Sequence, residues 1–184
     1  MVIPRIEVVR DREITAEEFL TKPRNPVRAL LDNIRSAFNV GSIFRTSDAA
    51  LVERLYLSGI TAYPPNQKLD KTALGSIPYV PWEHYENAID AVRAARADGY
   101  TIVSLEPSPA SVDYFRFRFP ERSCIVVGHE IAGVSKEVIS ASDAVVRIPM
   151  SGYKNTINVA TAFGIVLFEV LRQHRPGAGT STGN

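Results

Sequence analysis

The chain has 184 residues, of which 45% are hydrophobic and 22% are charged, a balance typical of one globular domain. Its single cysteine, Cys124, excludes a disulfide framework and a cysteine-based metal cluster within the chain. The formal net charge of +1 does not indicate a nucleic-acid-binding protein. Any affinity for RNA would therefore depend on local basic patches or on a surface assembled from two subunits.

The amino-terminal stretch lacks the apolar segment of a secretory signal, and the longest uncharged apolar run is too short to cross a bilayer. We therefore expect a protein of the reducing cytoplasm that has no membrane partner. Residues 1–26 are polar with scattered prolines and are expected to form an N-terminal extension. One domain is expected over residues 27–175, followed by a disordered tail at residues 176–184.

In chain order, the hydrophobic pattern predicts strands that alternate with helices. The expected strands cover residues 28–32, 54–58, 79–82, 100–105, 123–127 and 144–148. The expected helices cover residues 40–50, 84–97, 135–140 and 156–173. Strands rich in valine and isoleucine that alternate with helices predict an α/β fold, with a mainly parallel sheet flanked by helices. Ligands of such sheets bind beyond the carboxyl ends of the strands, so the loops that follow them are the candidate site.

The first unusual stretch is DNIRSAFNVGSIFRTSDAA, residues 32–50. If a helix begins near Val40, Asn39 is its N-cap and Gly41 permits close contact at its first turn. Arg45 follows Gly41 by four residues, on the same side of the helix, and its fork of donors suits a phosphate or a carboxylate. The alternative is a surface arginine paired with Asp48.

The second stretch is GHEIAGVS, residues 128–135, directly after a buried strand. Gly128 would let a ligand approach the backbone closely, and Gly133 is expected to adopt a positive φ. Glu130 either has a functional role or accepts hydrogen bonds from backbone N–H groups of an ordinary turn. His129 is a candidate general base or, alternatively, a plain turn histidine. The absence of G-x-G-x-x-G and of a P-loop motif argues against a dinucleotide site and a phosphate-binding loop.

The third stretch is IPMSGYKNTINVATAFGIVLFEVLRQ, residues 148–173. Either Thr156 or Asn158 can cap the helix that follows the polar loop. That helix is apolar almost all round, which indicates burial on more than one side. We expect it to pack on its own sheet and in a subunit interface, with close approach permitted by its small residues Ala160, Ala162 and Gly164.

Together the three stretches resemble the three motifs of the SpoU (TrmH-like) branch of the SPOUT RNA methyltransferases. The matching patterns are N-x-G-x-x-x-R at residues 39–45, G-x-E-x-x-G at residues 128–133, and I-P-M-x-G with a later asparagine at residues 148–158. The chain departs from the usual pattern at His129, where the branch has asparagine, and at Thr156-Ile157, where it has Ser-Leu.

The resemblance implies a SPOUT fold with a deep trefoil knot in its C-terminal part. It also implies a homodimer formed through the C-terminal helix, S-adenosylmethionine as cofactor, and 2′-O-ribose methylation of tRNA or rRNA. Carried over position by position, it implies the catalytic residues Asn39, Arg45, Glu130 and Asn158. It implies the cofactor-binding residues Leu105, Gly128, Ile148, Thr156 and Ile157.

The proton acceptor stays open, because a free guanidinium remains protonated at ordinary pH. Arg45 either loses its proton through burial beside another cation, or positions the hydroxyl while the proton leaves elsewhere. Two alternatives to ribose methylation also remain: binding of RNA or cofactor without turnover, and methylation of a base nitrogen. An enzyme of small molecules with an unrelated α/β fold is a third.

RNA is expected to bind basic side chains around the pocket. The candidates are Arg24, Arg28, Arg35, Lys71 and Lys154. Tyr63, Tyr79 and Tyr153 are candidates for stacking on a base. No metal is expected, because the three histidines lie far apart in the sequence and have no cysteine partners.

Overall fold

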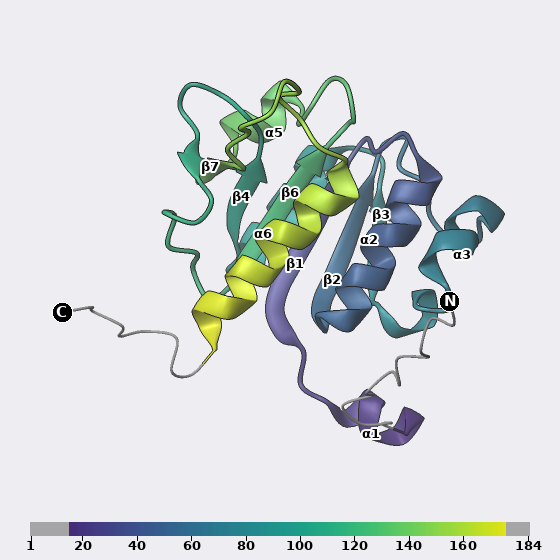
Figure 1. Ribbon diagram of the computed structural model, residues 1–184. Coiled ribbons are helices and arrows are strands. Elements are labelled where there is room, and N and C mark those ends of the chain that lie inside the picture. The colour runs from purple at the N-terminus through teal and green to yellow at the C-terminus, as the bar shows by residue number, and fades with distance from the viewer. Residues whose placement is uncertain (1–14, 176–184) are drawn as a thin grey trace, which may run out of the picture.

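The computed structural model describes residues 15–175, which form one seven-stranded sheet with helices packed on both faces (Figure 1). The strands are β1 (Asn25–Asp32), β2 (Val52–Ser58), β3 (Trp82–Tyr85), β4 (Thr101–Leu105), β5 (Val112–Asp113), β6 (Ser123–Gly128) and β7 (Ala144–Arg147). Their order is β3-β2-β1-β6-β4-β7-β5, and every neighbouring pair is parallel. The predicted fold class is therefore confirmed.

The helices are α1 (Ala16–Thr21), α2 (Ala37–Ala49), α3 (Gln67–Ala73), α4 (Ala88–Ala97), α5 (Lys136–Ser140) and α6 (Val159–His174), with a short 3-10 helix η1 (Ile77–Tyr79). Helices α2 and α6 lie side by side on one face of the sheet (Figure 1). Helix α4 packs against β1, β2 and β4 on the opposite face.

The central strands are buried on both faces, as a parallel sheet covered by two helical layers requires. Leu31 and Val127 belong to the apolar cluster beneath α2 and α6. Leu30 and Val126, their neighbours in the sequence, belong to the cluster beneath α4. This arrangement explains why these strands are continuous apolar runs rather than alternating ones.

The strand register brings the carboxyl ends of β1, β4, β6 and β7 to one edge of the sheet. Asp32 pairs with Gly128, and Leu105 pairs with Val146. Asp32 also accepts a hydrogen bond of 2.7 Å from the backbone N–H of Ser135, which ties the loop after β6 to the end of β1. The three loops after Leu105, Gly128 and Arg147 therefore converge.

Two predictions for the segment around Pro78 and Pro81 are wrong. The strand expected at residues 79–82 is instead the end of η1, and β3 begins only at Trp82. His84, expected at the start of a helix, lies within β3, because this edge strand extends through Tyr85 and α4 begins at Ala88. Pairing with β2 outweighs the local helical pattern there.

Helix α2 begins earlier than predicted. Its N-cap is Ser36, whose hydroxyl accepts a hydrogen bond from the backbone N–H of Asn39. Asn39 therefore lies within the first turn of the helix, and its side chain is available for contacts elsewhere. The short elements α1, α3 and β5 had no sequence prediction, because periodicity gives little signal over two to seven residues.

Part of the expected N-terminal extension lies within the described residues. Strand β1 begins at Asn25, and α1 is stabilised by a capping box between Thr15 and Glu18. Residues 1–14 and the tail at 176–184, which the sequence predicts to be disordered, lie outside the described residues.

Candidate functional site

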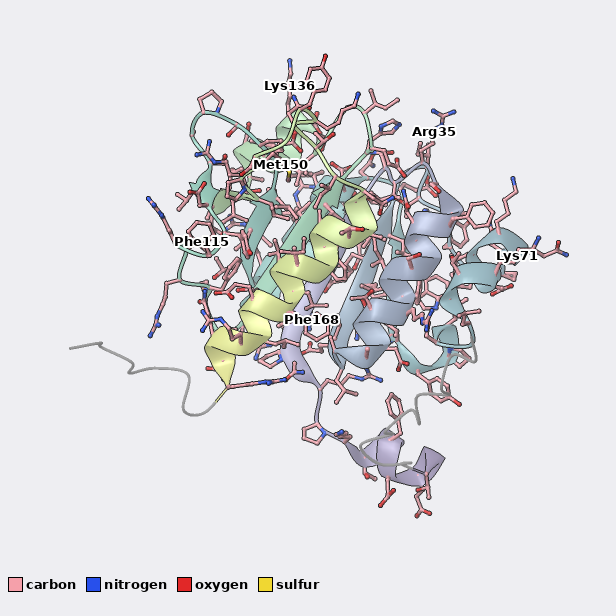
Figure 2. All side chains as sticks on the ribbon, viewed as in Figure 1. Arg35, Lys71, Phe115, Lys136, Met150 and Phe168 are labelled. Carbon is pink, nitrogen blue, oxygen red and sulfur yellow. The ribbon has the colours of Figure 1, made fainter. Side chains whose placement is uncertain are left out.

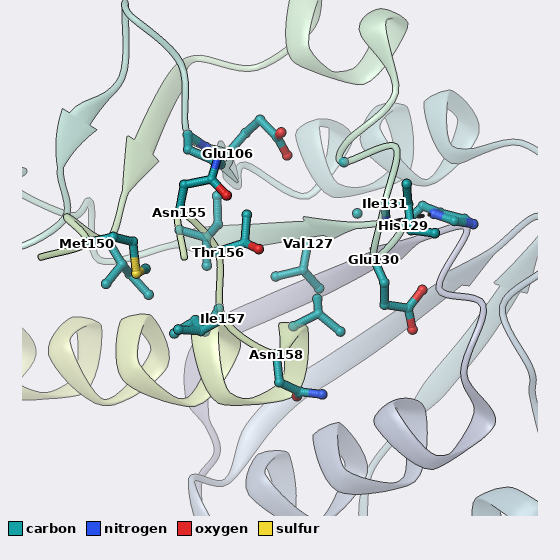
Figure 3. Close-up of a pocket in the computed structure, with 17 residues that line it drawn as sticks. Glu106, Val127, His129, Glu130, Ile131, Met150, Asn155, Thr156, Ile157 and Asn158 are labelled. Atoms are coloured by element: carbon teal, nitrogen blue, oxygen red, sulfur yellow. Dashed lines mark hydrogen bonds between the residues drawn. The ribbon is translucent and has the colours of Figure 1, made fainter. Parts of the chain in front are cut away.

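A cavity of about 430 Å³ lies at the carboxyl ends of β4, β6 and β7 (Figure 3). All five residues that the sequence assigns to the cofactor line it: Leu105, Gly128, Ile148, Thr156 and Ile157. The lining also includes residues that the sequence analysis missed, among them Glu106, Val127, Met150 and Asn155. The available signal was their position at or directly after the end of a strand, or in the loop before α6.

Position 128 requires a glycine because any side chain there would collide with the protein's own backbone. A Cβ at this position would lie 2.2 Å from the backbone nitrogen of Val134 and 2.3 Å from the carbonyl carbon of Gly133. The sequence-based reason, close approach of a ligand, is therefore incomplete, because the returning loop already fills this space. Gly133 has a φ of +73°, so its expected left-handed conformation is confirmed.

Glu130 receives hydrogen bonds from the start of α2, across almost one hundred residues of sequence. Its carboxylate accepts from the backbone N–H groups of Arg35 (2.9 Å) and Ser36 (3.0 Å) and from the amide Nδ2 of Asn39 (2.7 Å). Burial raises the pKa of Glu130, but hydrogen bonds from its own backbone, from Arg35, Asn39 and Ser36 outweigh that effect and hold the pKa below its ordinary value.

Asn158 connects the third motif to the same group. Its Nδ2 donates a hydrogen bond of 2.9 Å to Oδ1 of Asn39. Its own Oδ1 accepts from the backbone N–H groups of Ala160 (2.9 Å) and Thr161 (3.3 Å), so Asn158, rather than Thr156, is the N-cap of α6. The side chains of Asn39, Glu130 and Asn158 therefore form one hydrogen-bonded triad, which joins the three sequence motifs.

His129 acts within its own turn. Its Nδ1 accepts hydrogen bonds from the backbone N–H groups of Ile131 (3.1 Å) and Ala132 (3.2 Å). An asparagine oxygen can accept the same two bonds, which explains how histidine replaces the usual asparagine here. This geometry favours the turn-histidine interpretation over that of a general base at Nδ1.

Arg45 is exposed and lies in a second hollow of about 530 Å³, between α2, α3 and α6. Lys71 and Phe168 line the same hollow. Figure 2 shows Lys71 on α3 and Phe168 on α6. Neither Asn39 nor Arg45 lines the cavity at the strand ends within a single chain. Asn39 joins the first motif to the cavity through its hydrogen bonds with Glu130 and Asn158, whereas Arg45 does not reach it. The alternative ion pair of Arg45 with Asp48 is not among the ion pairs of the described residues.

Gly41 brings α3 against α2. A Cβ at Gly41 would lie 2.1 Å from Oγ1 of Thr72 and 2.3 Å from the carbonyl oxygen of Leu69. Oγ1 of Thr72 also donates a hydrogen bond to the carbonyl oxygen of Phe38 (2.9 Å). The close contact predicted at this glycine is thus a helix-to-helix contact, and it places Lys71 beside Arg45.

Two of the five basic side chains predicted to contact RNA around the pocket are in the wrong place. Arg28 is 6% exposed on β1 and forms hydrogen bonds with Glu53 (2.6 Å), Tyr56 (2.6 Å) and Asp98 (2.5 Å). Arg24 binds the carbonyl oxygens of Val52 and Tyr79 near the amino ends of the strands, opposite the cavity. Sequence clustering identified both because it does not distinguish a solvated arginine from one whose guanidinium is bound within the fold.

The other three candidates are exposed. Arg35 lies directly before α2, Lys71 on α3, and Lys154 in the loop before α6. Tyr153, beside Lys154, is 99% exposed. These residues remain predicted RNA contacts.

The cavity fits a nucleoside cofactor. Its volume lies in the usual range for small-molecule sites, and Leu105, Val127, Ile148 and Ile157 form an apolar wall suited to a purine ring. In residues 15–175 no group of three or more histidine, cysteine, aspartate or glutamate side chains is arranged to hold a metal ion. None of the helices described has the length and apolar composition needed to cross a membrane.

The fold and the site together define the class: a parallel α/β protein with a nucleoside-sized cavity at the carboxyl ends of its strands. Residues 26–168 match the model of the SpoU rRNA Methylase family, and the chain belongs to that family. This finding confirms the resemblance drawn from the three motifs.

Relatives with named activities include enzymes that act on tRNA and on rRNA. The chain is 31% identical over 167 residues to the tRNA (guanosine(18)-2'-O)-methyltransferase of Aquifex aeolicus, covering 90% of this chain and 78% of that protein. It is 33% identical over 185 residues to the 23S rRNA (uridine(2479)-2'-O)-methyltransferase of Streptomyces viridochromogenes, covering 96% of this chain and 63% of that protein.

Solved structures agree in fold. The AdoMet-bound rRNA methyltransferase from Sinorhizobium meliloti has a TM-score of 0.77 at 31% identity, over 84% of this chain and 59% of that one. The TrmH/SpoU tRNA modifying enzyme of A. aeolicus has a TM-score of 0.76 at 30% identity, over 84% of this chain and 78% of that one. This chain thus spans only about three fifths of some relatives and about three quarters of others.

Proposed function

We propose that this protein is an S-adenosylmethionine-dependent RNA methyltransferase that methylates a ribose 2′-hydroxyl of tRNA or rRNA. The observation that carries the proposal is the triad of Asn39, Glu130 and Asn158 beside a nucleoside-sized cavity. Membership of the SpoU family and the 2′-O-methyltransferase names of the relatives support the same reaction.

When bound, S-adenosylmethionine supplies an activated methyl group, which an aligned hydroxyl oxygen attacks. The apolar wall that includes Leu105, Ile148 and Ile157 would hold the adenine, and the exposed loop before α6 would cover it. The triad holds the loop after β6, the start of α2 and the start of α6 in one arrangement. We assign its three residues to positioning, because their polar groups are engaged with one another and with backbone N–H groups.

Arg45 is the residue proposed to contact the reacting ribose. Within one chain it lies in the hollow between α2, α3 and α6, beside the 48% exposed ring of Phe168. We propose that a homodimer formed through α6 covers Phe168 and brings Arg45 of one subunit to the cofactor cavity of the other. The exposure of Phe168, a large apolar side chain on α6, supports this arrangement.

The direct test is transfer of a labelled methyl group to total tRNA and rRNA, followed by mapping of ribose methylation. The Arg45→Ala variant should bind the cofactor normally by calorimetry and lose turnover. Arg93→Ala, which changes an exposed arginine on α4, is the matched control and should retain turnover. Full turnover by Arg45→Ala would contradict the assignment of Arg45.

Mixed dimers test whether Arg45 acts across the interface. One subunit carries Arg45→Ala, and the other carries Gly128→Val, which is expected to abolish cofactor binding. If Arg45 serves the partner's cavity, the mixed dimer contains one complete site and recovers activity. If Arg45 serves its own cavity, neither site is complete and the mixture stays inactive.

The alternatives predict different products. A binding protein without turnover would give no labelled RNA. A base-nitrogen methyltransferase would give labelled RNA that alkali still cleaves at the labelled nucleotide, because the ribose 2′-hydroxyl there stays free. We further propose that the domain extends to residue 175, that its C-terminal part is knotted and that the protein is cytoplasmic. We also propose that Arg35, Lys71 and Lys154 contact the RNA. Binding through these cations should weaken steeply with salt.

A further inference from the structure

Glu106 is a charged residue of the cavity to which neither the motifs nor the triad assigns a role. It follows Leu105 at the end of β4, and its backbone N–H donates to the carbonyl oxygen of Val146 on β7 (3.0 Å). Its Oε2 accepts a hydrogen bond from the backbone N–H of Val134 (3.1 Å). Backbone and side chain are therefore both held in place at the cavity wall.

The loop after β6 is shaped around this carboxylate. A Cβ at Gly133 would lie 2.4 Å from Oε1 of Glu106, so glycine is needed there for space as well as for its positive φ. Within the described part of the chain, Oε1 of Glu106 has no hydrogen-bond partner and the carboxylate has no ion pair. Glu106 and Asn155 both line the cavity (Figure 3).

The charges around the cavity all have one sign. Of the described residues that line it, only Glu106 and Glu130 carry a full charge, and none is lysine or arginine. The carboxylate of Glu130 is compensated by three donors from the start of α2. Glu106 accepts one backbone bond only, so it is the uncompensated negative charge of this cavity. An uncompensated carboxylate in a partly enclosed site favours a cationic ligand.

We infer that Glu106 makes the cavity selective for the charge of its ligand, so that it holds the cationic S-adenosylmethionine more tightly than the demethylated product. This inference rests on the proposed function. The donor carries one more positive charge than S-adenosylhomocysteine, and otherwise differs from it by one methyl group. A neighbouring carboxylate therefore distinguishes the two ligands by their charge. An apolar wall would not distinguish them in this way.

The test is calorimetric binding of three nucleosides to the full chain: S-adenosylmethionine, S-adenosylhomocysteine, and sinefungin, in which an amine replaces the methylsulfonium. Glu106→Gln keeps the size of the side chain and an oxygen that can accept from Val134. It should weaken binding of both cationic ligands by about tenfold and binding of the product by less than about threefold. Glu137→Gln, which removes an exposed acid of α5 outside the cavity, should leave all three affinities unchanged.

Equal losses for all three ligands would overturn the inference, since they would make Glu106 an acceptor for a group that the ligands share. No loss for any ligand would also overturn it. If Glu106→Gln does not fold, a salt titration of ligand binding to the wild-type protein tests the inference instead, because salt screens the attraction between the Glu106 carboxylate and a cationic ligand. The ratio of donor to product affinity should then fall as salt rises, and a constant ratio would overturn the inference. A wild-type protein that binds none of the nucleosides would instead remove the proposed function itself.

Discussion

At the scale of the residue, Asn158 combines a structural and a positioning contact in one amide group. Its oxygen caps α6, and its nitrogen reaches Asn39, which in turn donates to Glu130. Sequence reasoning left capping and function as alternatives for this residue. The structure shows that the amide of Asn158 makes both contacts at once, because its oxygen accepts the capping bonds and its nitrogen donates to Asn39.

Substitutions at Asn158 should separate the two contacts. Asn158→Ala removes the cap and should lower the free energy of unfolding by about 1 kcal/mol. Asn158→Asp retains a cap oxygen but loses the donor to Asn39, so it should cost less stability and still lose most methyl transfer. Urea unfolding and the labelled-methyl assay measure the two effects, with Thr161→Ala in the same helical turn as control. Equal destabilisation by both variants would show that the contact with Asn39, rather than the cap, stabilises the fold.

Glu130 predicts an acid-dependent loss of stability. Its pKa in the folded protein lies below its ordinary value of 4.5, so its carboxylate stabilises the fold fully above about pH 4.5. That contribution is lost as the pH falls through the lowered value. The difference in free energy of unfolding between wild type and Glu130→Gln should therefore be constant near neutral pH and shrink in acid. A difference that does not change with pH would contradict this role.

At the scale of the element, the turn after β6 depends on the absence of two side chains. Gly128 faces the backbone of Gly133 and Val134, and Gly133 faces the carboxylate of Glu106. The sequence indicated that these glycines matter, because they flank a strand end and a tight turn. It did not identify the neighbour of each, since those neighbours depend on how the loop returns across the strand.

Gly128→Ala should displace the loop at residues 133–134 and lower the free energy of unfolding by about 1–3 kcal/mol. Because that loop also forms the cavity, affinity for S-adenosylmethionine should fall with it. Gly152→Ala is the matched control, since a Cβ at Gly152 meets no atom within 4 Å. Thermal unfolding and calorimetry check both outcomes, and a Gly128→Ala protein of wild-type stability would refute the steric argument.

At the scale of the whole molecule, the sheet has functional groups at one edge and a charged cluster toward the other. Arg28 is surrounded by Glu53, Tyr56 and Asp98, with its guanidinium carbon 4.2 Å from the centre of the Tyr100 ring. Burial lowers the pKa of Arg28, but the hydrogen bonds that it donates to Asp98 and Glu53 outweigh this effect and raise the pKa. This cluster joins β1, β2 and the end of α4, so its role is cohesion of the fold.

Arg28→Met should therefore lower stability rather than RNA affinity. Removing Arg28 leaves Glu53 and Asp98 without their cation. Because both carboxylates keep contact with solvent, we expect a cost of about 2 kcal/mol, below that of a fully buried pair. Arg93→Met, in an exposed pair on α4, should cost less than about 1 kcal/mol. Urea unfolding measures both, and RNA binding by the folded Arg28→Met protein should equal that of wild type.

The sequence by itself determined the parallel α/β fold, the three motifs and the five residues assigned to the cofactor, all of which line the cavity. These features depend on local periodicity and on short patterns, such as the two glycines at and after the end of β6, which can be recognised in the sequence. It also indicated the family, because three weak motifs occur in the correct order.

Only the tertiary structure decided which polar groups meet. The bonds between Asn39, Glu130 and Asn158 span up to 119 residues, and the burial of Arg28 depends on acids from β2 and the end of α4. Glu106 became a candidate only when the loop after β6 was seen to leave its carboxylate uncompensated. Hydrogen bonding and charge compensation depend on distances in space. A pattern along the chain therefore identifies the polar residues but does not indicate which of them are partners.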